Sequence, residues 1–202
     1  MSEYTPELIR CLDGGRSPWH TVEMAAQYLN ANGFSPLDLA KPFEVRRGAD
    51  SSTLSVILEK LSLALGLDRA AMLDACMNGM LLSCDAAHAM HPNHPEYADP
   101  SCAPLLGRGV ALKRSPRYAS DAETCAVIQG LCDAYGIPLQ IYMNRADLPG
   151  GSTVGSMASS LLAMPAVDIG VPILAMHSAR ELMAAADQDA FVKLCTAFFS
   201  AK

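Results

Sequence analysis

The segment SCDAAHAMHPNHPE, residues 83–96, gathers side chains that can bind metal ions or transfer protons. Its three histidines lie three residues apart, a spacing that can place side chains on one face of a helix. However, a proline directly follows two of them, and proline disfavours helical geometry in the residue before it. A three-histidine helical metal site is therefore disfavoured. The carboxylate and histidine residues of the segment are Asp85, His88, His91, His94 and Glu96.

Two of the candidate residues follow apolar runs that are typical of buried strands. GMLLSC directly precedes Asp85, with His88 three residues further on, and PILAM directly precedes His177. In open α/β sheets, ligands bind just beyond the carboxyl ends of the strands. An aspartate and a histidine at such ends suit a metal site. At the same positions, an aspartate can instead cap a helix and a histidine can bind a backbone carbonyl.

A glycine-rich stretch, PGGSTVGS at residues 149–156, precedes an expected helix. Glycines before a helix start are found in loops that cradle phosphate. This stretch lacks the lysine of a P-loop and the GxGxxG spacing. Its backbone amides suit a substrate carboxylate or carbonyl equally well. The chain has no GxSxG motif, so a nucleophilic serine is not supported.

The elements that must position these residues alternate between strands and helices. Helices are expected at 4–12, from Pro18 to just before Gly33, and at 53–65, 68–76, 120–135, 153–162 and 187–199. Strands are expected at 80–84, 109–114, 138–144 and 167–170. Ser17 is the expected cap of the second helix, and Ser120 with Glu123 forms the expected capping box of the helix at 120–135. This order predicts an α/β sandwich with a largely parallel sheet.

The composition excludes several classes of protein. The chain has 202 residues, half of them hydrophobic, and a formal net charge of −6. The acidic balance argues against a nucleic-acid partner, because no basic stripe is present to neutralise phosphates. No apolar run reaches the roughly 18 residues of a membrane-spanning helix, and the acidic amino terminus does not read as a signal peptide. Seven scattered cysteines, without a CxxC pair, predict reduced thiols and a cytoplasmic location.

Read together, these segments resemble the aspartyl aminopeptidase family of cytosolic two-zinc metallopeptidases. The resemblance rests on four strings in the expected order, SCDAAHAMHPNHPE, VALKRSPRYASDAET, NRADLPGGSTVGSMAS and VDIGVPILAMHSARE. RRGADSSTLSVILEKL and the opening LIRCLDGGRSPWHTVEMAAQYLNANGF are also similar to family segments. The resemblance implies a three-layer α/β sandwich of the metallopeptidase (phosphorylase/hydrolase-like) type. Residues 1–202 would form a single domain, with opening helices at 1–42 and the carboxyl-terminal part of the peptidase domain at 43–202.

The resemblance also implies roles for individual residues and a substrate. Peptides with an N-terminal aspartate or glutamate would be the substrate, zinc the cofactor, and a homo-oligomer the assembly found in the family. Asp85 and His177 would be metal ligands, while His91 and His94 would be loop residues. The substrate pocket would be lined by His88, Lys113 and Tyr118, with Gly151, Ser152 and Thr153 as its backbone wall.

The chain departs from the family where the opening helices end. There the family has a long stretch with a histidine ligand, a bridging aspartate, a pair of glutamates and an oligomerisation domain. Only FEV, residues 43–45, is similar to the second glutamate of the pair, which makes Glu44 a candidate ligand. PEYADPSCAPLL also lacks the family's Asn-His pair. The catalytic residues are therefore not identified.

A catalytic zinc normally has three protein ligands and a water. With two clear ligands, we expect weak zinc binding and little peptidase activity from the shortened chain. The uncovered sheet would favour self-association. The sequence leaves three hypotheses: an aminopeptidase for acidic residues, a non-catalytic remnant acting as an interaction module, and an unrelated phosphate-binding α/β domain.

Overall fold

A computed structural model describes residues 5–15, 18–35, 50–148, 150–178 and 180–201. The chain divides into two compact units, residues 1–45 and 46–202, and each is described by itself. Glu44, the expected cap Ser17 and the Arg46–Arg47 pair lie outside the described residues. None of the described helices is long and apolar enough to cross a membrane.

Within its described residues, 5–15 and 18–35, the first unit contains two helices, α1 (Thr5–Gly14) and α2 (Pro18–Ala31). Both were predicted from the sequence. Proline is tolerated at the first position of a helix because its missing N–H has no partner there in any case. Gly33, two residues past the end of α2, has φ +85°, a conformation that glycine adopts without steric cost. The predicted start and end of α2 are therefore confirmed.

The second unit is built on a four-stranded sheet in the order β1-β5-β3-β4. β1 pairs in parallel with β5 and β3 in parallel with β4, whereas β3 and β5 are antiparallel. The mostly parallel sheet predicted from the sequence is therefore confirmed. The strands are β1 (Leu81–Cys84), β3 (Val110–Lys113), β4 (Leu139–Tyr142) and β5 (Ala166–Gly170).

A smaller sheet continues the larger one beyond the ends of β1 and β5. It consists of β2 (Ala87–His88), β6 (Pro172–Leu174) and β7 (Leu182–Met183), in the order β2-β6-β7. The Asp85 N–H donates to the Ile169 carbonyl, and the Ala87 N–H donates to the Val171 carbonyl. The pairing of β1 with β5 therefore runs on into that of β2 with β6, and Asp85 lies at the junction. The sequence did not predict β2 or β7, because two residues carry no readable periodicity.

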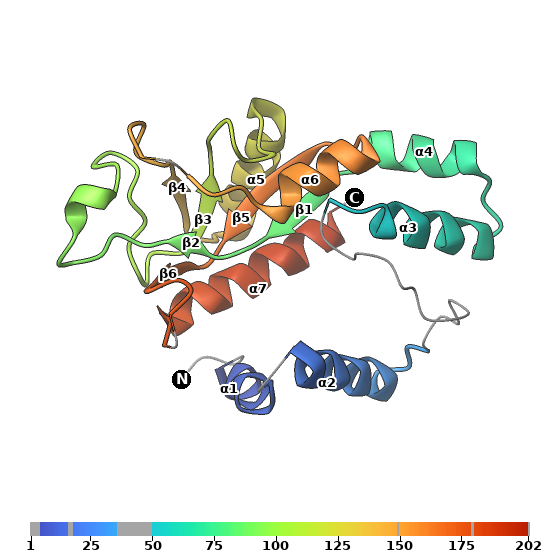
Figure 1. Ribbon diagram of the computed structural model, residues 1–202, viewed down its shortest axis with the longest axis horizontal. Helices are drawn as coiled ribbons and strands as arrows, with labels where there is room; N and C mark the ends of the chain where they lie inside the picture. Colours follow the sequence, from blue (N-terminus) through green and yellow to red (C-terminus); the bar gives the residue numbers. More distant parts are fainter. Residues whose placement is uncertain (1–4, 16–17, 36–49, 149, 179, 202) are drawn as a thin grey trace. The chain divides into compact units, whose positions relative to one another are not determined.

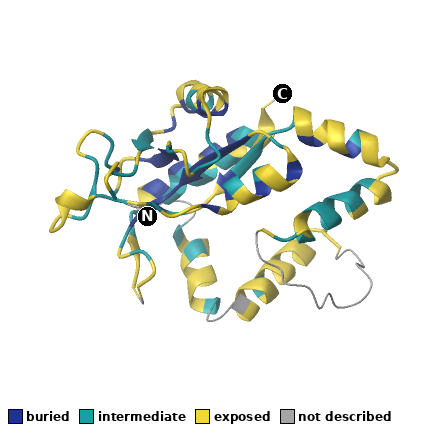
Figure 2. Ribbon diagram, turned by 45° about the horizontal axis from the view of Figure 1, so that its top comes forward, coloured by how far each residue is buried: buried dark blue, intermediate teal, exposed yellow. Residues whose placement is uncertain are grey.

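Helices cover both faces of the larger sheet (Figure 1). Val110, Leu112, Val167 and Ile169 point into the core that α5 (Ala122–Tyr135) and α7 (Ala185–Ser200) complete. The alternate positions point to the other face, which α6 (Val154–Leu162) covers. The two central strands of the larger sheet, β5 and β3, are buried at every residue, as Figure 2 shows. The three-layer α/β sandwich is thereby confirmed.

The other described helices of the second unit are α3 (Thr53–Ala64), α4 (Arg69–Asn78) and η1 (Pro95–Tyr97). α3 contacts α4 and α6, and η1 is a single 3-10 turn. Asp68 caps α4 by accepting from the Ala71 N–H at 2.8 Å.

The capping box of α5 was predicted one residue too early. It is formed by Asp121 and Thr124, because Asp121 accepts from the Thr124 N–H and the Thr124 hydroxyl accepts from the Asp121 N–H. Ser120 instead accepts a hydrogen bond from the backbone N–H of Asp168. The aspartate, one residue closer to the helix, holds the capping position.

Candidate functional site

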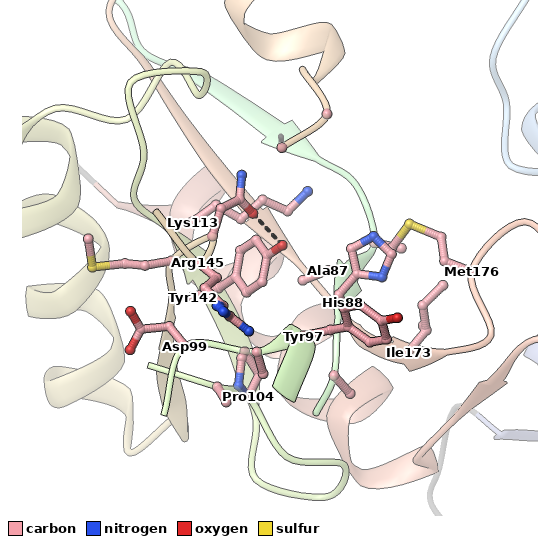
Figure 3. A pocket seen from close by; sticks show the side chains of 18 of the residues that line it. Ala87, His88, Tyr97, Asp99, Pro104, Lys113, Tyr142, Arg145, Ile173 and Met176 are labelled. Carbon is pink, nitrogen blue, oxygen red and sulfur yellow. Dashed lines mark hydrogen bonds between the residues drawn. The ribbon is translucent and has the colours of Figure 1, made fainter. Parts of the chain in front are cut away.

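An open pocket of about 590 Å³ lies in the second unit, beside the junction of β1 and β2 (Figure 3). It is lined by the loops that follow β2, β3, β4 and β6 and by the glycine-rich loop before α6. The pocket therefore brings together residues that are as far apart in the sequence as Asp85 and His177. Among them are eight of the nine residues selected from the sequence, namely Asp85, His88, Lys113, Tyr118, Gly151, Ser152, Thr153 and His177.

Lys113, the last residue of β3, is the only charged side chain of the pocket that is almost fully buried among those described, with 2% exposure. Its Nζ lies 3.4 Å from Asp85 Oδ2. Burial lowers the pKa of the Lys113 ammonium below its usual value, and the carboxylates of Asp85 and Asp168 act in the opposite direction. A cation thus lies at the wall of the pocket, paired with the Asp85 carboxylate, while the charge of Asp168 acts on it from beyond ion-pair distance.

Asp85 directly follows β1, and half of its side chain is exposed to solvent. One carboxylate oxygen accepts from the Ala86 N–H at 2.8 Å, and the other faces Lys113. A Cβ at Gly170 would lie 2.0 Å from the Asp85 carbonyl oxygen, so only glycine fits beside this residue. The strand end therefore presents a carboxylate to the pocket in a fixed backbone setting.

The two histidines selected from strand ends lie within electrostatic range of each other. Partial burial is the largest cause that lowers the pKa of His88, and the charges of His177 and Lys113 lower it further. His177 has φ +68°, which is uncommon outside glycine, and its N–H donates to Glu181 Oε1 at 2.6 Å. A tight turn after β6 thus places His177 at the pocket.

His91 and His94 lie in the loop between β2 and η1, as expected, and they also line the pocket. Their ring centroids are 5.4 Å apart, and His94 Nδ1 lies 3.0 Å from Glu96 Oε1. This segment therefore forms part of the wall without forming a helix.

Two tyrosines and an asparagine form the side of the pocket next to Lys113. The hydroxyls of Tyr118 and Tyr142 both donate to Asn144 Oδ1. The Lys113 Nζ lies 5.5 Å from the centroid of the Tyr118 ring, within the range of a cation–π contact. Burial raises the pKa of both tyrosines, so the phenols stay protonated and can donate hydrogen bonds at neutral pH.

The glycine-rich loop leads into α6 at Thr153, whose side chain is buried and does not cap the helix. Gly151 and Ser152 are exposed along the pocket. A Cβ at Gly150 would lie 1.8 Å from the Asn144 amide nitrogen, so the loop passes close to the asparagine. The loop thus forms part of the pocket wall.

Several residues of the site were not predicted from the sequence. Tyr142 is the last residue of β4, and Asn144 and Arg145 follow it, where their position at the end of an apolar run could have indicated them. Arg145 is engaged with Asp147 and with the backbone carbonyl of Glu96. Asp168 could have been found as the one charged residue within the apolar run AVDIG.

The donors for a metal ion at this pocket are few. Asp85 supplies oxygen and His177 supplies an imidazole nitrogen, a combination that suits zinc. Among the described residues, no group of three or more histidine, cysteine, aspartate or glutamate side chains lies close enough to hold a metal. The carboxylate of Asp85 is moreover engaged by Lys113. The described residues therefore do not by themselves fit a catalytic zinc ion.

Two curated relatives of similar sequence are described as M18 family aminopeptidases. The Mycobacterium tuberculosis (strain H37Rv) protein described as probable M18 family aminopeptidase 2 is 45% identical over 157 residues, which are 77% of this chain and 36% of that protein. The Clostridium acetobutylicum protein of the same description is 44% identical over 144 residues, 70% of this chain and 33% of the relative. The chain therefore spans about a third of the length of these relatives.

Solved structures give the same result. The M18 family aminopeptidase from Thermotoga maritima matches with a TM-score of 0.65 and 26% identity, over 75% of this chain and 36% of that one. The mApe1 dodecamer from S. cerevisiae matches with a TM-score of 0.67 and 25% identity, over 78% and 35% of the two chains. The family model described as aminopeptidase I zinc metalloprotease (M18) matches residues 43–199. The chain therefore belongs to the M18 family of aminopeptidases.

Proposed function

We propose that residues 43–202 are the carboxyl-terminal part of an M18 peptidase domain that binds peptides with an N-terminal aspartate or glutamate. Residues 1–42 would be the opening helices of the same domain. The observation that carries the proposal is the Lys113 ammonium, which is almost fully buried at the wall of a pocket. A cation that has already lost its water is a strong and selective partner for a substrate carboxylate.

In this proposal each pocket residue has a separate role. Lys113 pairs with the side-chain carboxylate of the first substrate residue, and the neutral phenol of Tyr118 donates a hydrogen bond beside it. His88 flanks the substrate, and the backbone of Gly151, Ser152 and Thr153 forms the facing wall. These contacts would fix the substrate terminus before any bond is broken.

Asp85 and His177 would contribute two of the ligands of the zinc site of the whole peptidase. A zinc ion held there in the whole peptidase would supply Lewis-acid chemistry. Because the described residues offer two ligands where a catalytic site uses three, we infer that the chain by itself binds zinc weakly and turns over little peptide. Glu44 remains the candidate third ligand.

The shortage of ligands also favours a second candidate function. The chain would then be a non-catalytic member of the family that keeps the pocket and acts as an interaction module. A neighbour in the structural comparison is a dodecamer, and self-association of this chain is proposed on that ground. A cytoplasmic location is proposed as well. Both candidate functions require the pocket to bind an acidic group.

Calorimetric titration with two tetrapeptides tests the proposal. One begins with aspartate and the other with asparagine, and three alanines follow in both. We expect the aspartyl peptide to bind at least about tenfold more tightly, since a buried charge pair contributes more than 1.4 kcal/mol. Lys113→Met should remove this preference, whereas Lys193→Met, at an exposed lysine of α7, should keep it. Equal affinity of the two peptides for the unmodified chain would refute the proposed specificity.

A further inference from the structure

Asp168 lies in the middle of β5 and is fully buried, with 0% exposure. In the register of β3 with β5, Leu112 lies opposite Ile169. Continuing this antiparallel register by one residue places Lys113 opposite Asp168. Because side chains alternate between the two faces of a sheet, Lys113 and Asp168 lie on the same face. Directly opposed residues of opposite charge attract each other across a strand pair.

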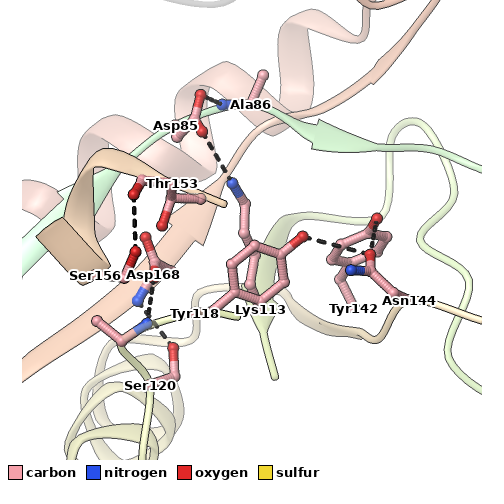
Figure 4. A network of polar contacts seen from close by, with 11 residues as sticks. Asp85, Ala86, Lys113, Tyr118, Ser120, Tyr142, Asn144, Thr153, Ser156 and Asp168 are labelled. Atoms are coloured by element: carbon pink, nitrogen blue, oxygen red, sulfur yellow. Dashed lines mark hydrogen bonds and ion pairs between the residues drawn. The ribbon is translucent and has the colours of Figure 1, made fainter. Parts of the chain in front are cut away.

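Asp168 also fixes the segment that carries Tyr118 (Figure 4). Its Oδ2 accepts from the Ala119 N–H at 2.7 Å, and its own backbone N–H donates to the Ser120 hydroxyl at 2.9 Å. Ser120 also forms a parallel bridge with Ala166. The residue after Tyr118 is thus bonded directly to the Asp168 carboxylate.

The second carboxylate oxygen, Asp168 Oδ1, is buried without a hydrogen-bond partner in the described structure. It faces the start of α6, where a Cβ at Gly155 would lie 2.7 Å from it. A buried carboxylate with one satisfied oxygen is costly unless a positive charge lies nearby. Lys113 is the positive charge on the same face of the sheet, opposite Asp168 in the extended register, and the charge of Asp168 acts on its ammonium without a direct ion pair.

The two carboxylates that act on Lys113 differ in what else they can bind. Asp85 is half exposed and lines the pocket, so it is open to solvent and to any bound cation. Asp168 does not line the pocket and has no contact with solvent. Only Asp168 can therefore act on Lys113 in the same way whether or not Asp85 has another partner.

We propose that Asp168 is a positioning residue, a permanent buried counter-charge that holds Lys113 and the Tyr118 segment at the pocket wall when Asp85 binds another cation. This inference rests on the proposed function, because Lys113 is assigned there to the substrate carboxylate. Asp168 does not touch the substrate and acts through Lys113 and Ala119.

Nuclear magnetic resonance of the lysine side chains tests this role without substrate or metal. The full chain is labelled with ¹⁵N-lysine, and the Lys113 ammonium signal is assigned from its loss in Lys113→Met. A held, buried ammonium exchanges its protons slowly with water and gives a resolved signal. In Asp168→Asn, which keeps the shape and an acceptor for Ala119, we expect the exchange rate to rise about tenfold or more, because the ammonium loses the attraction of a buried negative charge on its own face of the sheet.

Two further variants make the result specific. In Asp85→Asn, at a half-exposed position, the Lys113 signal should persist, because Asp168 still holds the ammonium. In Asp187→Asn, at a carboxylate that is also fully buried but accepts from Gly107 and Gly109, the signal should not change. A general loss of stability would raise the exchange rate of the Lys113 ammonium in both Asp168→Asn and Asp187→Asn. A positioning role raises it only in Asp168→Asn.

Each result decides the inference. Loss of the Lys113 signal in Asp85→Asn, an unchanged signal in Asp168→Asn, or no resolved signal in the unmodified chain would overturn it. If Asp168→Asn does not fold, the Lys113 signal in Asp85→Asn still tests the inference, since its loss would overturn it. Failure of the aspartyl peptide to bind the unmodified chain would count against the proposed function and leave this measurement intact.

Discussion

Lys113 Nζ and Asp85 Oδ2 lie 3.4 Å apart, although β3 and β1 are not neighbours in the sheet. β5 runs between them, and Gly170 at its end lies beside Asp85 with no side chain. The lysine therefore reaches across a strand to a carboxylate at a strand end. The same arrangement brings a cation and a potential metal ligand to one wall of the pocket.

Gly170→Ala tests the close approach at this point. The added Cβ would meet the Asp85 carbonyl oxygen at 2.0 Å, so the backbone must shift. We expect a loss of about 2 kcal/mol in the free energy of unfolding, as for overpacked sites. Gly130→Ala is the matched control, because a Cβ there meets nothing within 4 Å on α5. This control should stabilise the chain by up to about 1 kcal/mol, and equal effects in urea denaturation would contradict the account.

Lys113→Met should be costly, because it leaves the buried Asp168 carboxylate without its counter-charge. Leaving a buried charge without compensation typically costs about 3 kcal/mol or more in the free energy of unfolding. Asp85→Asn, at a half-exposed residue, should cost less than about 1 kcal/mol. Denaturant midpoints of the two variants measure the difference. A cost for Asp85→Asn as large as that for Lys113→Met would show that Asp85 is the main partner.

The cap of α5 makes a prediction about acid. The hydrogen bond from the Thr124 N–H is the largest cause that lowers the pKa of the Asp121 carboxyl. A group whose pKa is lower in the folded than in the unfolded chain stabilises the fold above its unfolded pKa. This contribution is lost as the pH falls through the folded pKa. Asp121→Ala should therefore cost about 1 kcal/mol at neutral pH and progressively less in acid.

Thermal denaturation at a series of pH values measures this dependence. Glu123→Ala is the control, because the sequence alone had placed the capping box on Ser120 and Glu123, whereas the structure places it on Asp121 and Thr124. The control should leave stability nearly unchanged at every pH. A larger effect of Glu123→Ala than of Asp121→Ala would restore the sequence-based cap.

Burial makes a further prediction about thiol reactivity. It raises the pKa of Cys132 in the core to about 11, so this thiol is protonated at neutral pH. Because the thiolate is the reactive form, iodoacetamide should modify the exposed Cys11 and leave Cys132 unmodified in the folded chain. Mass spectrometry of the digested chain reads both sites. Equal labelling of both would contradict the core described for the second unit.

The order of helices and strands was largely predictable from the sequence. Apolar runs marked β1, β3, β4 and β5, and Pro18 and Gly33 marked the ends of α2. Such signals are local, because each of them is complete within the segment that it marks. Two-residue strands such as β2 and β7 were not predictable, because they exist only through pairing with β6.

The candidate site was predictable in part, because only some of its residues are marked by local signals in the sequence. Asp85 and His177 follow apolar runs and were found, and the structure places both at one pocket. Asp168 stands out as a charged residue in an apolar run, but the residue that it faces depends on the antiparallel pairing of β5 with β3. That pairing cannot be read from the alternation of strands and helices, which predicts parallel neighbours.

We propose that this chain contains the substrate-binding residues of an M18 pocket but too few ligands to hold zinc. The most direct measurement is elemental analysis of zinc after reconstitution and desalting, on a sample whose oligomeric mass is known. We predict close to zero ions per chain, because Asp85 and His177 alone hold zinc weakly. Two ions per chain would contradict this claim and assign the chain a complete metal site.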